Sequence, residues 1–396
     1  MRVTRISATA LSVAVPLPPG GKAHPLAAPF VSYCLVRVET DDGLVGWGEI
    51  SDGWGCEYGT VAAAIVDEAL SRFVLGQDPR DIPELVARMW AWLRRRQGTT
   101  WLIANAISGV EIALHDLAAR AAGVSVSALI GPPLRSAIPV YATGLALSQG
   151  DAKVQADFFR PLIARGLRAG KVRLGPNWES ELGTLGEMRE ILGPDVAIGV
   201  DGNESFSAKT AARIADHLAD LDIAFFEEPM PRSDPGALRW LVGRSKVPIA
   251  YGEHVHTANG FRELAERGLA DIWQPDVTGC GGFLESRAIA AHAAGRGTRI
   301  SPHSATTPLG MGANLHAAAV APTLWRMEWS ASSVAELAGC FSGTEVLTGP
   351  ITDGALPLPP GVGLGIVPNV EALRERFAYR TPWQIQSAPI LYRGAA

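Results

Sequence analysis

The sequence predicts an α/β fold in which a TIM-like barrel is joined to a smaller α+β domain. Three observations indicate this: a length of 396 residues, strands followed by helices before about residue 135, and a repeat of short apolar runs and helical stretches after it. A typical barrel of this kind takes roughly 250 residues. The chain is therefore long enough for one barrel and a companion domain.

The composition is that of a globular protein without a nucleic-acid or membrane partner. Hydrophobic residues make up 47% and charged residues 19%, and 35 basic residues against 40 acidic ones give a net charge of -5. No basic run exceeds 94–96, and we find neither a signal-peptide core nor an apolar stretch of membrane-spanning length. The few cysteines lack CxxC spacing, which favours a reduced protein and a cytoplasmic location.

The first 130 residues carry the signals of the smaller domain. The segment 36–49 reads as two alternating strands joined by an Asp-Gly turn, which is typical of a hairpin. Apolar residues then recur at spacings of three and four over 59–74, 82–97 and 101–122, and Gly123 is placed to end the last helix. Strands followed by helices without interleaving predict an α+β domain.

From residue 138 onward, short apolar runs alternate with helical stretches. Alternation of strands and crossover helices requires a parallel sheet, and eight such units close into a barrel. The eight predicted strands are Val140–Thr143, Lys171–Leu174, Ala197–Asp201, Ile223–Glu227, Ile249–Glu253, Ile272–Asp276, Thr298–His303 and Trp325–Glu328.

Polar residues end these predicted strands on their C-terminal side. They are Lys171, Arg173, Asp201, Glu227, Glu253, Asp276, His303 and Glu328. Neighbours from Asp201 to His303 lie 23 to 27 positions apart, which is one strand-helix unit each. Because the C-terminal ends of barrel strands meet at one face, we expect these side chains to converge there.

Three of these residues have the chemistry of a divalent-metal site. Asp201, Glu227 and Glu253 offer hard carboxylate oxygens, which suit Mg²⁺, with Mn²⁺ as the alternative, better than zinc. Glu228 competes with Glu227 for the role, but alternation of side chains along a strand favours Glu227. Asn203 is expected to hydrogen-bond the metal-binding residues, the substrate or its own loop.

Taken together, these motifs resemble the enolase superfamily, in its mandelate-racemase-like branch. The resemblance covers nearly the whole chain and places one motif on each strand from the second to the eighth. It implies a (β/α)7β barrel at 135–340, under a capping domain formed by residues 1–130 and a C-terminal segment, 345–396, that returns to it. It also implies metal binding by the three carboxylates and a homo-oligomer.

The family reaction implied by this resemblance is removal of the proton α to a carboxylate. The intermediate is an enediolate that the metal stabilises. His303 is the expected base, because Asp276 could accept its other N–H and fix the tautomer. Glu328 resembles the family's electrophile, a role that requires a protonated carboxyl group; a salt bridge with Arg326 or another arginine is the alternative.

Arg173 departs from the lysine that is commonest at this position. A guanidinium stays protonated, which disfavours a racemisation that needs two bases. A single base is sufficient for dehydration, and the resemblance implies an aldonic or aldaric acid as the substrate. Lys171 could bind the carboxylate beside Arg173, or act as base itself. Racemisation, epimerisation, lactone cycloisomerisation and a non-catalytic barrel that binds a metal or carboxylate stay open.

Substrate contacts outside the barrel strands are expected from two loops of the capping domain. These loops, 17–24 and 51–58, are rich in glycine or proline, and loops of this kind commonly carry specificity. His24, Trp54 and Tyr58 are candidates to shape the distal pocket, although each could instead pack against its own domain. His254 follows the fifth strand and is a further candidate for substrate contact.

Overall fold

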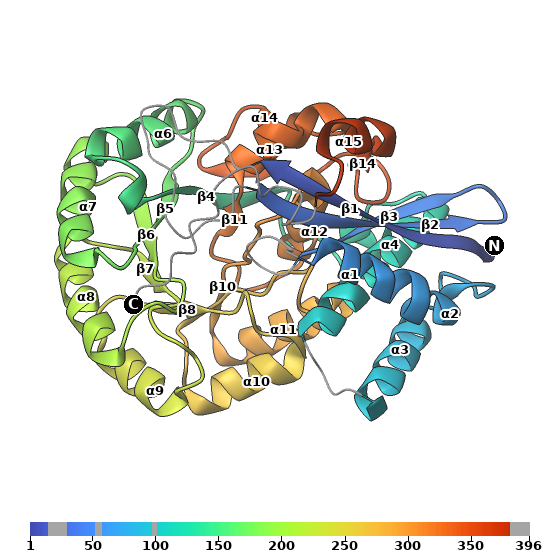
Figure 1. Ribbon diagram of the computed structural model, residues 1–396, viewed down its shortest axis with the longest axis horizontal. Coiled ribbons are helices and arrows are strands. Elements are labelled where there is room, and N and C mark those ends of the chain that lie inside the picture. The colour runs from blue at the N-terminus through green and yellow to red at the C-terminus, as the bar shows by residue number, and fades with distance from the viewer. Residues whose placement is uncertain (15–29, 52–57, 97–100, 381–396) are drawn as a thin grey trace.

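The computed structural model describes residues 1–14, 30–51, 58–96 and 101–380 (Figure 1). The chain begins with an antiparallel sheet in the order β1-β2-β3. The predicted hairpin is present, because β2 pairs with β3 on either side of Gly43, whose φ of 83° is favourable for glycine. The strands are β1 Val3–Ala14, β2 Phe30–Thr40 and β3 Val45–Ile50.

Helices cover this sheet, as the sequence predicts. The stretch predicted over 59–74 is helical throughout but contains a π-helical segment in its middle. The helices are α1 Gly59–Ala64, η1 Ile65–Leu70, α2 Ser71–Val74, α3 Ile82–Arg96, α4 Trp101–Ala122 and the short α5 Val126–Ile130. Helix α4 packs closely on β3, where a Cβ atom at Gly48 would collide with the backbone carbonyl of Gly109.

The expectation that no apolar stretch reaches membrane-spanning length was wrong for helix α4, which has the length and composition of a membrane span. The segment concerned is Leu102–Ala122, and 94% of its apolar stretch is buried inside the fold.

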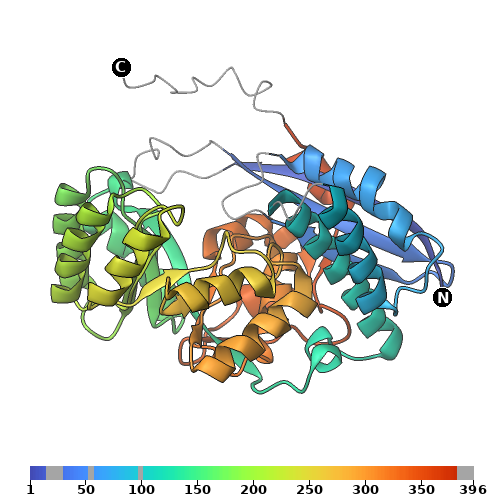
Figure 2. The same ribbon diagram turned by 90° about the horizontal axis from the view of Figure 1, so that it is seen from below.

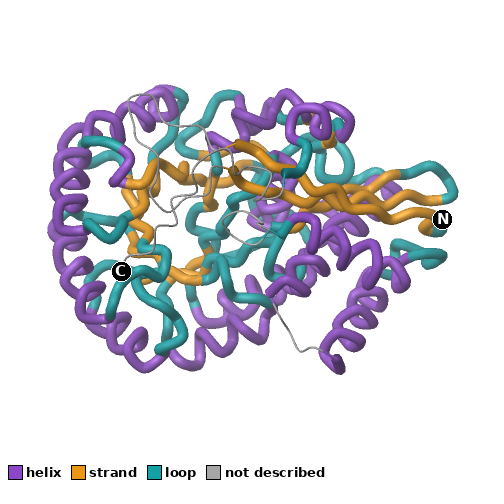
Figure 3. The backbone as a smooth tube through the Cα atoms, in the orientation of Figure 1, coloured by secondary structure: helices purple, strands orange, loops and turns teal. Residues whose placement is uncertain are grey.

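Eight parallel strands form the barrel, and seven helices separate them. The strands are β4 Ala137–Ala146, β5 Ala169–Arg173, β6 Ala197–Asp201, β7 Phe225–Glu227, β8 Ile249–Tyr251, β9 Ile272–Trp273, β10 Arg299–Ile300 and β11 Met327–Trp329. The helices are α6 Ala152–Ala164, α7 Trp178–Leu192, α8 Ala208–Asp220, α9 Pro235–Arg244, α10 Thr257–Arg267, α11 Gly282–Arg296 and α12 Pro308–Ala319. They wrap around the outside of the strands (Figure 3).

The strand order is β10-β9-β8-β7-β6-β5-β4-β11, and the two ends of this order meet. The backbone N–H of Trp325 donates to the carbonyl of Ile300 (2.8 Å), and that of Glu328 donates to Pro302 (2.9 Å). These bonds join β10 and the residues just after it to β11 and the segment leading into it. The predicted (β/α)7β barrel is therefore the observed architecture.

Three strands end two or three residues earlier than the sequence predicts. Strand β8 ends at Tyr251, β9 at Trp273 and β10 at Ile300, so Glu253, Asp276 and His303 lie in the loops that follow. Their expected placement within strands was wrong, because the residues after each strand end are as buried as the strand itself and the end of strand pairing leaves no mark in the sequence. The side chains still reach the same face of the barrel.

The C-terminal part of the described chain runs back over both regions. Strand β13 pairs antiparallel with β4, and α15 lies against β1, where Arg374 Nη2 donates to Thr9 Oγ1 (3.0 Å). Figure 2 shows the barrel beside the sheet and helices of the N-terminal region. The remaining elements are α13 Ala331–Leu337, η3 Ala338–Cys340, β12 Phe341–Ser342, α14 Glu345–Thr348, β13 Ala355–Pro357, β14 Val367–Pro368 and α15 Val370–Phe377. The exact domain boundaries stay predictions.

Candidate active site

Neighbouring strands bring three of the predicted site residues into one row. In the sheet register, Arg173 of β5 is opposite Asp201 of β6, and Asp201 is opposite Glu227 of β7. Lys171 lies two residues before Arg173 and therefore on the same side of its strand. All four side chains belong to the interior face of the barrel.

Lys171 is the centre of the charge network. Its side chain is 1% exposed, and its Nζ donates to Glu227, lies 3.1 Å from Glu328 Oε1 and lies 3.4 Å from Asp201 Oδ2. Burial alone would lower the pKa of Lys171, but these carboxylates raise it well above its ordinary value. These surroundings favour the ammonium form of Lys171; whether it binds the substrate carboxylate or acts as base stays a prediction.

The charges around Glu328 favour its anionic form. Burial would raise its pKa, but Lys171 and His303, with a hydrogen bond from Thr143, lower the pKa to about 2. The protonated electrophile expected from the resemblance is therefore not the state that this arrangement favours. The alternative partner Arg326 is not the one observed, since its guanidinium lies over the ring of Trp325, 5.0 Å from the centroid.

His303 and Asp276 form the predicted pair. His303 Nδ1 lies 2.9 Å from Asp276 Oδ2, and both side chains are almost fully buried. The other ring nitrogen, Nε2, lies 3.5 Å from Glu253 and 3.6 Å from Glu328. Burial lowers the pKa of His303, but these carboxylates raise it to about 10. Asp276 thus fixes one nitrogen, while the other faces the polar centre of the barrel.

Several polar residues at this centre were missed by sequence reasoning. Gln274 Nε2 donates to Glu227 Oε2 (2.5 Å), and the backbone N–H of Ser304 donates to Glu328 Oε2 (3.2 Å). Asn314 Nδ2 donates to Asp276 Oδ1 (2.9 Å). The position of Gln274, two residues before Asp276, and the lone buried amide of Asn314 in an apolar helix were the signals available in the sequence.

The donor set at the strand ends suits a divalent cation. Asp201, Glu227 and Glu253 are buried carboxylates, and further acidic side chains surround them. Burial raises the pKa of Glu227; Lys171 opposes this shift, and the neighbouring carboxylates add to it. A bound cation would offset this repulsion, so the residues present fit Mg²⁺ or Mn²⁺.

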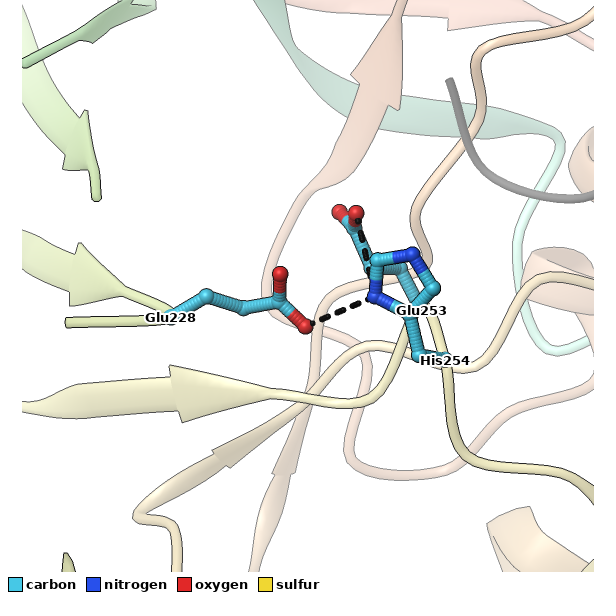
Figure 4. Close-up of side chains that lie close together, drawn as sticks. All are labelled: Glu228, Glu253 and His254. Carbon is cyan, nitrogen blue, oxygen red and sulfur yellow. Dashed lines mark hydrogen bonds and ion pairs between the residues drawn. The ribbon is translucent and has the colours of Figure 1, made fainter. Parts of the chain in front are cut away.

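A second carboxylate grouping lies beside the predicted one and shares Glu253 with it. Glu228, Glu253 and His254 each offer a ligand atom, and these atoms lie within 4.8 Å of one another (Figure 4). His254 Nδ1 contacts Glu228 Oε1 at 3.0 Å and Glu253 Oε1 at 3.5 Å. Burial raises the pKa of Glu228 to about 7, with Glu253 adding to the shift. Glu227 and Glu228 therefore face different neighbours.

The predicted substrate-contact residues divide into three cases. Asn203 hydrogen-bonds Asp201, with its backbone N–H 2.9 Å from Oδ1 and its Nδ2 3.2 Å from Oδ2. His254 is 39% exposed beside Glu228 and Glu253, and Tyr58 is 48% exposed. His24 and Trp54 lie outside the described residues.

Two family models match the chain in the order that its architecture suggests. Residues 12–131 match the mandelate racemase / muconate lactonizing enzyme N-terminal domain, and residues 155–373 match an enolase C-terminal domain-like model. The chain belongs to the mandelate racemase-like branch of the enolase superfamily. It is an enzyme of that superfamily, and membership of it typically implies a divalent metal.

Relatives within this superfamily are named for three reactions. A D-galactarolactone cycloisomerase from Agrobacterium fabrum is 33% identical over 368 residues, covering 89% of this chain and 95% of the relative. A D-xylonate dehydratase from Haloferax volcanii is 27% identical, with 86% and 84% covered. The solved structure of a racemase from Streptomyces coelicolor with bound magnesium is 28% identical, with a TM-score of 0.82 and coverage of 95% and 100%.

Proposed function

We propose that this enzyme dehydrates an aldonic or aldaric acid to a 2-keto-3-deoxy acid. The observation that carries the proposal is the His303–Asp276 pair: Nδ1 of His303 contacts Asp276 and Nε2 points to the carboxylates at the strand ends, whereas Arg173 is a guanidinium and cannot act as a second base. The relatives named as dehydratases act on acid sugars, which supports this substrate class.

In this reaction His303 acts first as base and then as acid. Positive charge held at Glu253 would offset the carboxylate charge that raises the pKa of His303, so that Nε2 can take the α-proton. The hydrogen bond between Nδ1 and Asp276 fixes the ring and stabilises the imidazolium that forms. The imidazolium then donates that proton to the leaving β-hydroxyl group. The β C–O bond breaks, water leaves, and the resulting enol tautomerises to the 2-keto acid.

Asp201, Glu227 and Glu253 are the residues that we propose to hold Mg²⁺, with Mn²⁺ as the alternative. When bound, the cation supplies positive charge beside the substrate carboxylate. The in-register pairing of Asp201 with Glu227 and the burial of all three carboxylates support this set. Asn203 donates to both carboxylate oxygens of Asp201 and would hold this ligand in place.

The two adjacent glutamates offer a direct test of this metal site. We expect Glu227→Gln to weaken Mn²⁺ binding at least about tenfold, because it removes a ligand oxygen charge, and Glu228→Gln to change it by less than about threefold. Isothermal titration calorimetry measures both affinities. The opposite order would assign the metal to the group formed by Glu228, Glu253 and His254.

The test of the reaction is turnover of a panel of aldonic and aldaric acids with Mg²⁺. Semicarbazide detects 2-keto-3-deoxy products, and NMR in D₂O detects solvent deuterium in recovered substrate. We expect keto product from at least one acid. If recovered substrate contains deuterium but no acid gives a keto product, the reaction is racemisation or epimerisation and the proposal of dehydration is wrong.

A second candidate is a lactone cycloisomerase. The observation that favours it is the cycloisomerase named above, which is 33% identical over most of both chains. The same α-proton removal by His303 would begin that reaction, so aldarolactones belong in the panel beside the open acids. Product from the lactones alone would assign the chain to this class.

We also propose that the enzyme is cytoplasmic and forms a homo-oligomer. The small-molecule carboxylate substrate is supported by the acid-sugar names of the relatives. Sedimentation of the purified enzyme would measure its oligomeric state.

A further inference from the structure

A buried carboxylate from the N-terminal sheet binds the start of a barrel helix. Glu49 of β3 is 0% exposed, and it accepts hydrogen bonds from the backbone N–H groups of Thr307 (2.8 Å) and Gly310 (2.8 Å) and from the Thr307 hydroxyl group. Thr307 is the N-cap of α12. The first N–H groups of a helix lack partners within it, so Glu49 caps α12 from outside the barrel.

The same helix holds the catalytic pair. Asn314 lies one turn after Gly310, is 1% exposed, and donates from Nδ2 to Asp276 Oδ1 (2.9 Å). Its Oδ1 accepts from the backbone N–H of Val277 (3.1 Å). The other oxygen of Asp276 is the one that contacts His303. A continuous series of contacts therefore leads from Glu49 through α12 to the imidazole.

A neighbouring helix offers a natural comparison. Glu111 of α4 is also 0% exposed, and its carboxylate accepts from the backbone N–H groups of Phe283 (2.8 Å) and Leu284 (2.9 Å) at the start of α11. Within the described ranges, no side chain of α11 is among the hydrogen-bond partners of Asp276 or His303. Glu111 thus makes a similar contact between the two regions, but no side chain of α11 connects it to the carboxylate of Asp276.

We propose that Glu49 is a positioning residue of the N-terminal domain, which fixes α12 so that Asn314 orients Asp276 and, through it, His303. This rests on the proposed role of His303 as the base. Three donors converge on Glu49, and an amide in its place would direct N–H toward at least one of them. The N-terminal domain therefore helps to orient the base His303, in addition to packing against the barrel.

The experiment is a double-mutant cycle with Glu49→Gln and Asn314→Leu, and with Glu111→Gln as the matched control. The first readout needs neither metal nor substrate: it is the Nδ1–H proton resonance of His303, assigned by its loss in His303→Asn. The second readout is kcat and KM with the acid that the panel identifies. Thermal unfolding of every variant measures how much stability each substitution removes.

We expect Glu49→Gln to shift or broaden the His303 resonance and to lower kcat about tenfold, with KM within about twofold. Asn314→Leu should lower kcat by about 10- to 100-fold, as is usual for residues that orient a catalytic group through a hydrogen bond. Because Glu49 acts through Asn314, the double variant should be no slower than Asn314→Leu. Glu111→Gln should reduce stability but leave the resonance and kcat unchanged.

Two results would overturn the proposal: equal effects of Glu49→Gln and Glu111→Gln on the resonance, or additive effects of Glu49→Gln and Asn314→Leu on kcat. If Glu49→Gln does not fold, Glu49→Asp, which keeps the charge and shortens its reach, enters the same cycle. A resonance that responds as expected in an enzyme that converts no acid in the panel would uphold the positioning role and reject the proposed dehydration.

Discussion

His303→Asn is expected to lower the rate of α-proton removal by about a hundredfold to ten-thousandfold. Asparagine keeps a polar side chain of similar reach but cannot take a proton, and a positioned general base contributes a factor of this size. The measurement is the rate of keto-product formation, together with deuterium exchange at the α-carbon, for the acid that the wild-type enzyme converts.

The matched control for this variant is His217→Asn, on the exposed side of helix α8. It should leave the rate within about twofold, because the residue lies on an outer helix of the barrel. Exchange that persists at the wild-type rate in His303→Asn would transfer the role of base to another residue and remove the central argument for dehydration.

Lys171→Met is expected to lower the free energy of unfolding by about 3–5 kcal/mol at neutral pH, because breaking a buried ion pair leaves uncompensated charge. Three buried carboxylates lie around this one ammonium group. Methionine has a similar length, so the loss of charge dominates over the loss of packing. Urea unfolding of the metal-free protein, monitored by tryptophan fluorescence, measures the difference.

The same difference should depend on pH. Lys171 helps to lower the pKa of Glu328 to about 2 from an ordinary value of 4.5, so this part of the stability is present above pH 4.5 and is lost as the pH falls toward 2. The wild-type and Lys171→Met proteins should therefore converge in stability over this window, as far as both remain folded. A constant difference would mean that lost packing, rather than charge, causes the effect.

Lys153→Met is the control for Lys171→Met. The side chain of Lys153 is 74% exposed and pairs with Asp157 on the surface of α6. Exposed ion pairs contribute about 0–1 kcal/mol, so this variant should stay close to the wild type. A loss as large as that of Lys171→Met would show that burial of the ammonium group is not the cause.

The arrangement of strands and helices could be predicted because its causes are local. Alternating apolar runs and helical stretches after residue 138 require a parallel sheet, and the hairpin at 36–49 is specified by its Asp-Gly turn. The ends of β8, β9 and β10 could not be predicted. Where a strand and the loop after it are both buried, hydrophobic pattern no longer distinguishes them.

The residue types at the C-terminal face of the barrel were also predictable, because the C-terminal ends of parallel strands meet at one face. Their neighbours were not. Glu227 and Glu228 are adjacent in sequence, yet the first contacts Lys171 and Gln274 and the second contacts His254. Which contacts each carboxylate makes depends on distances between strands, and these follow from the closed barrel.

The sequence by itself determined the fold class, the family and the order of polar residues around the barrel, since each depends on spacing along the chain. Only the tertiary structure showed that the surroundings favour the ammonium form of Lys171 and the anionic form of Glu328, because these preferences follow from burial and from charges brought together from different strands. It also decided the link from Glu49 to Asp276. That link joins residues more than 200 positions apart, and no local sequence pattern indicates it.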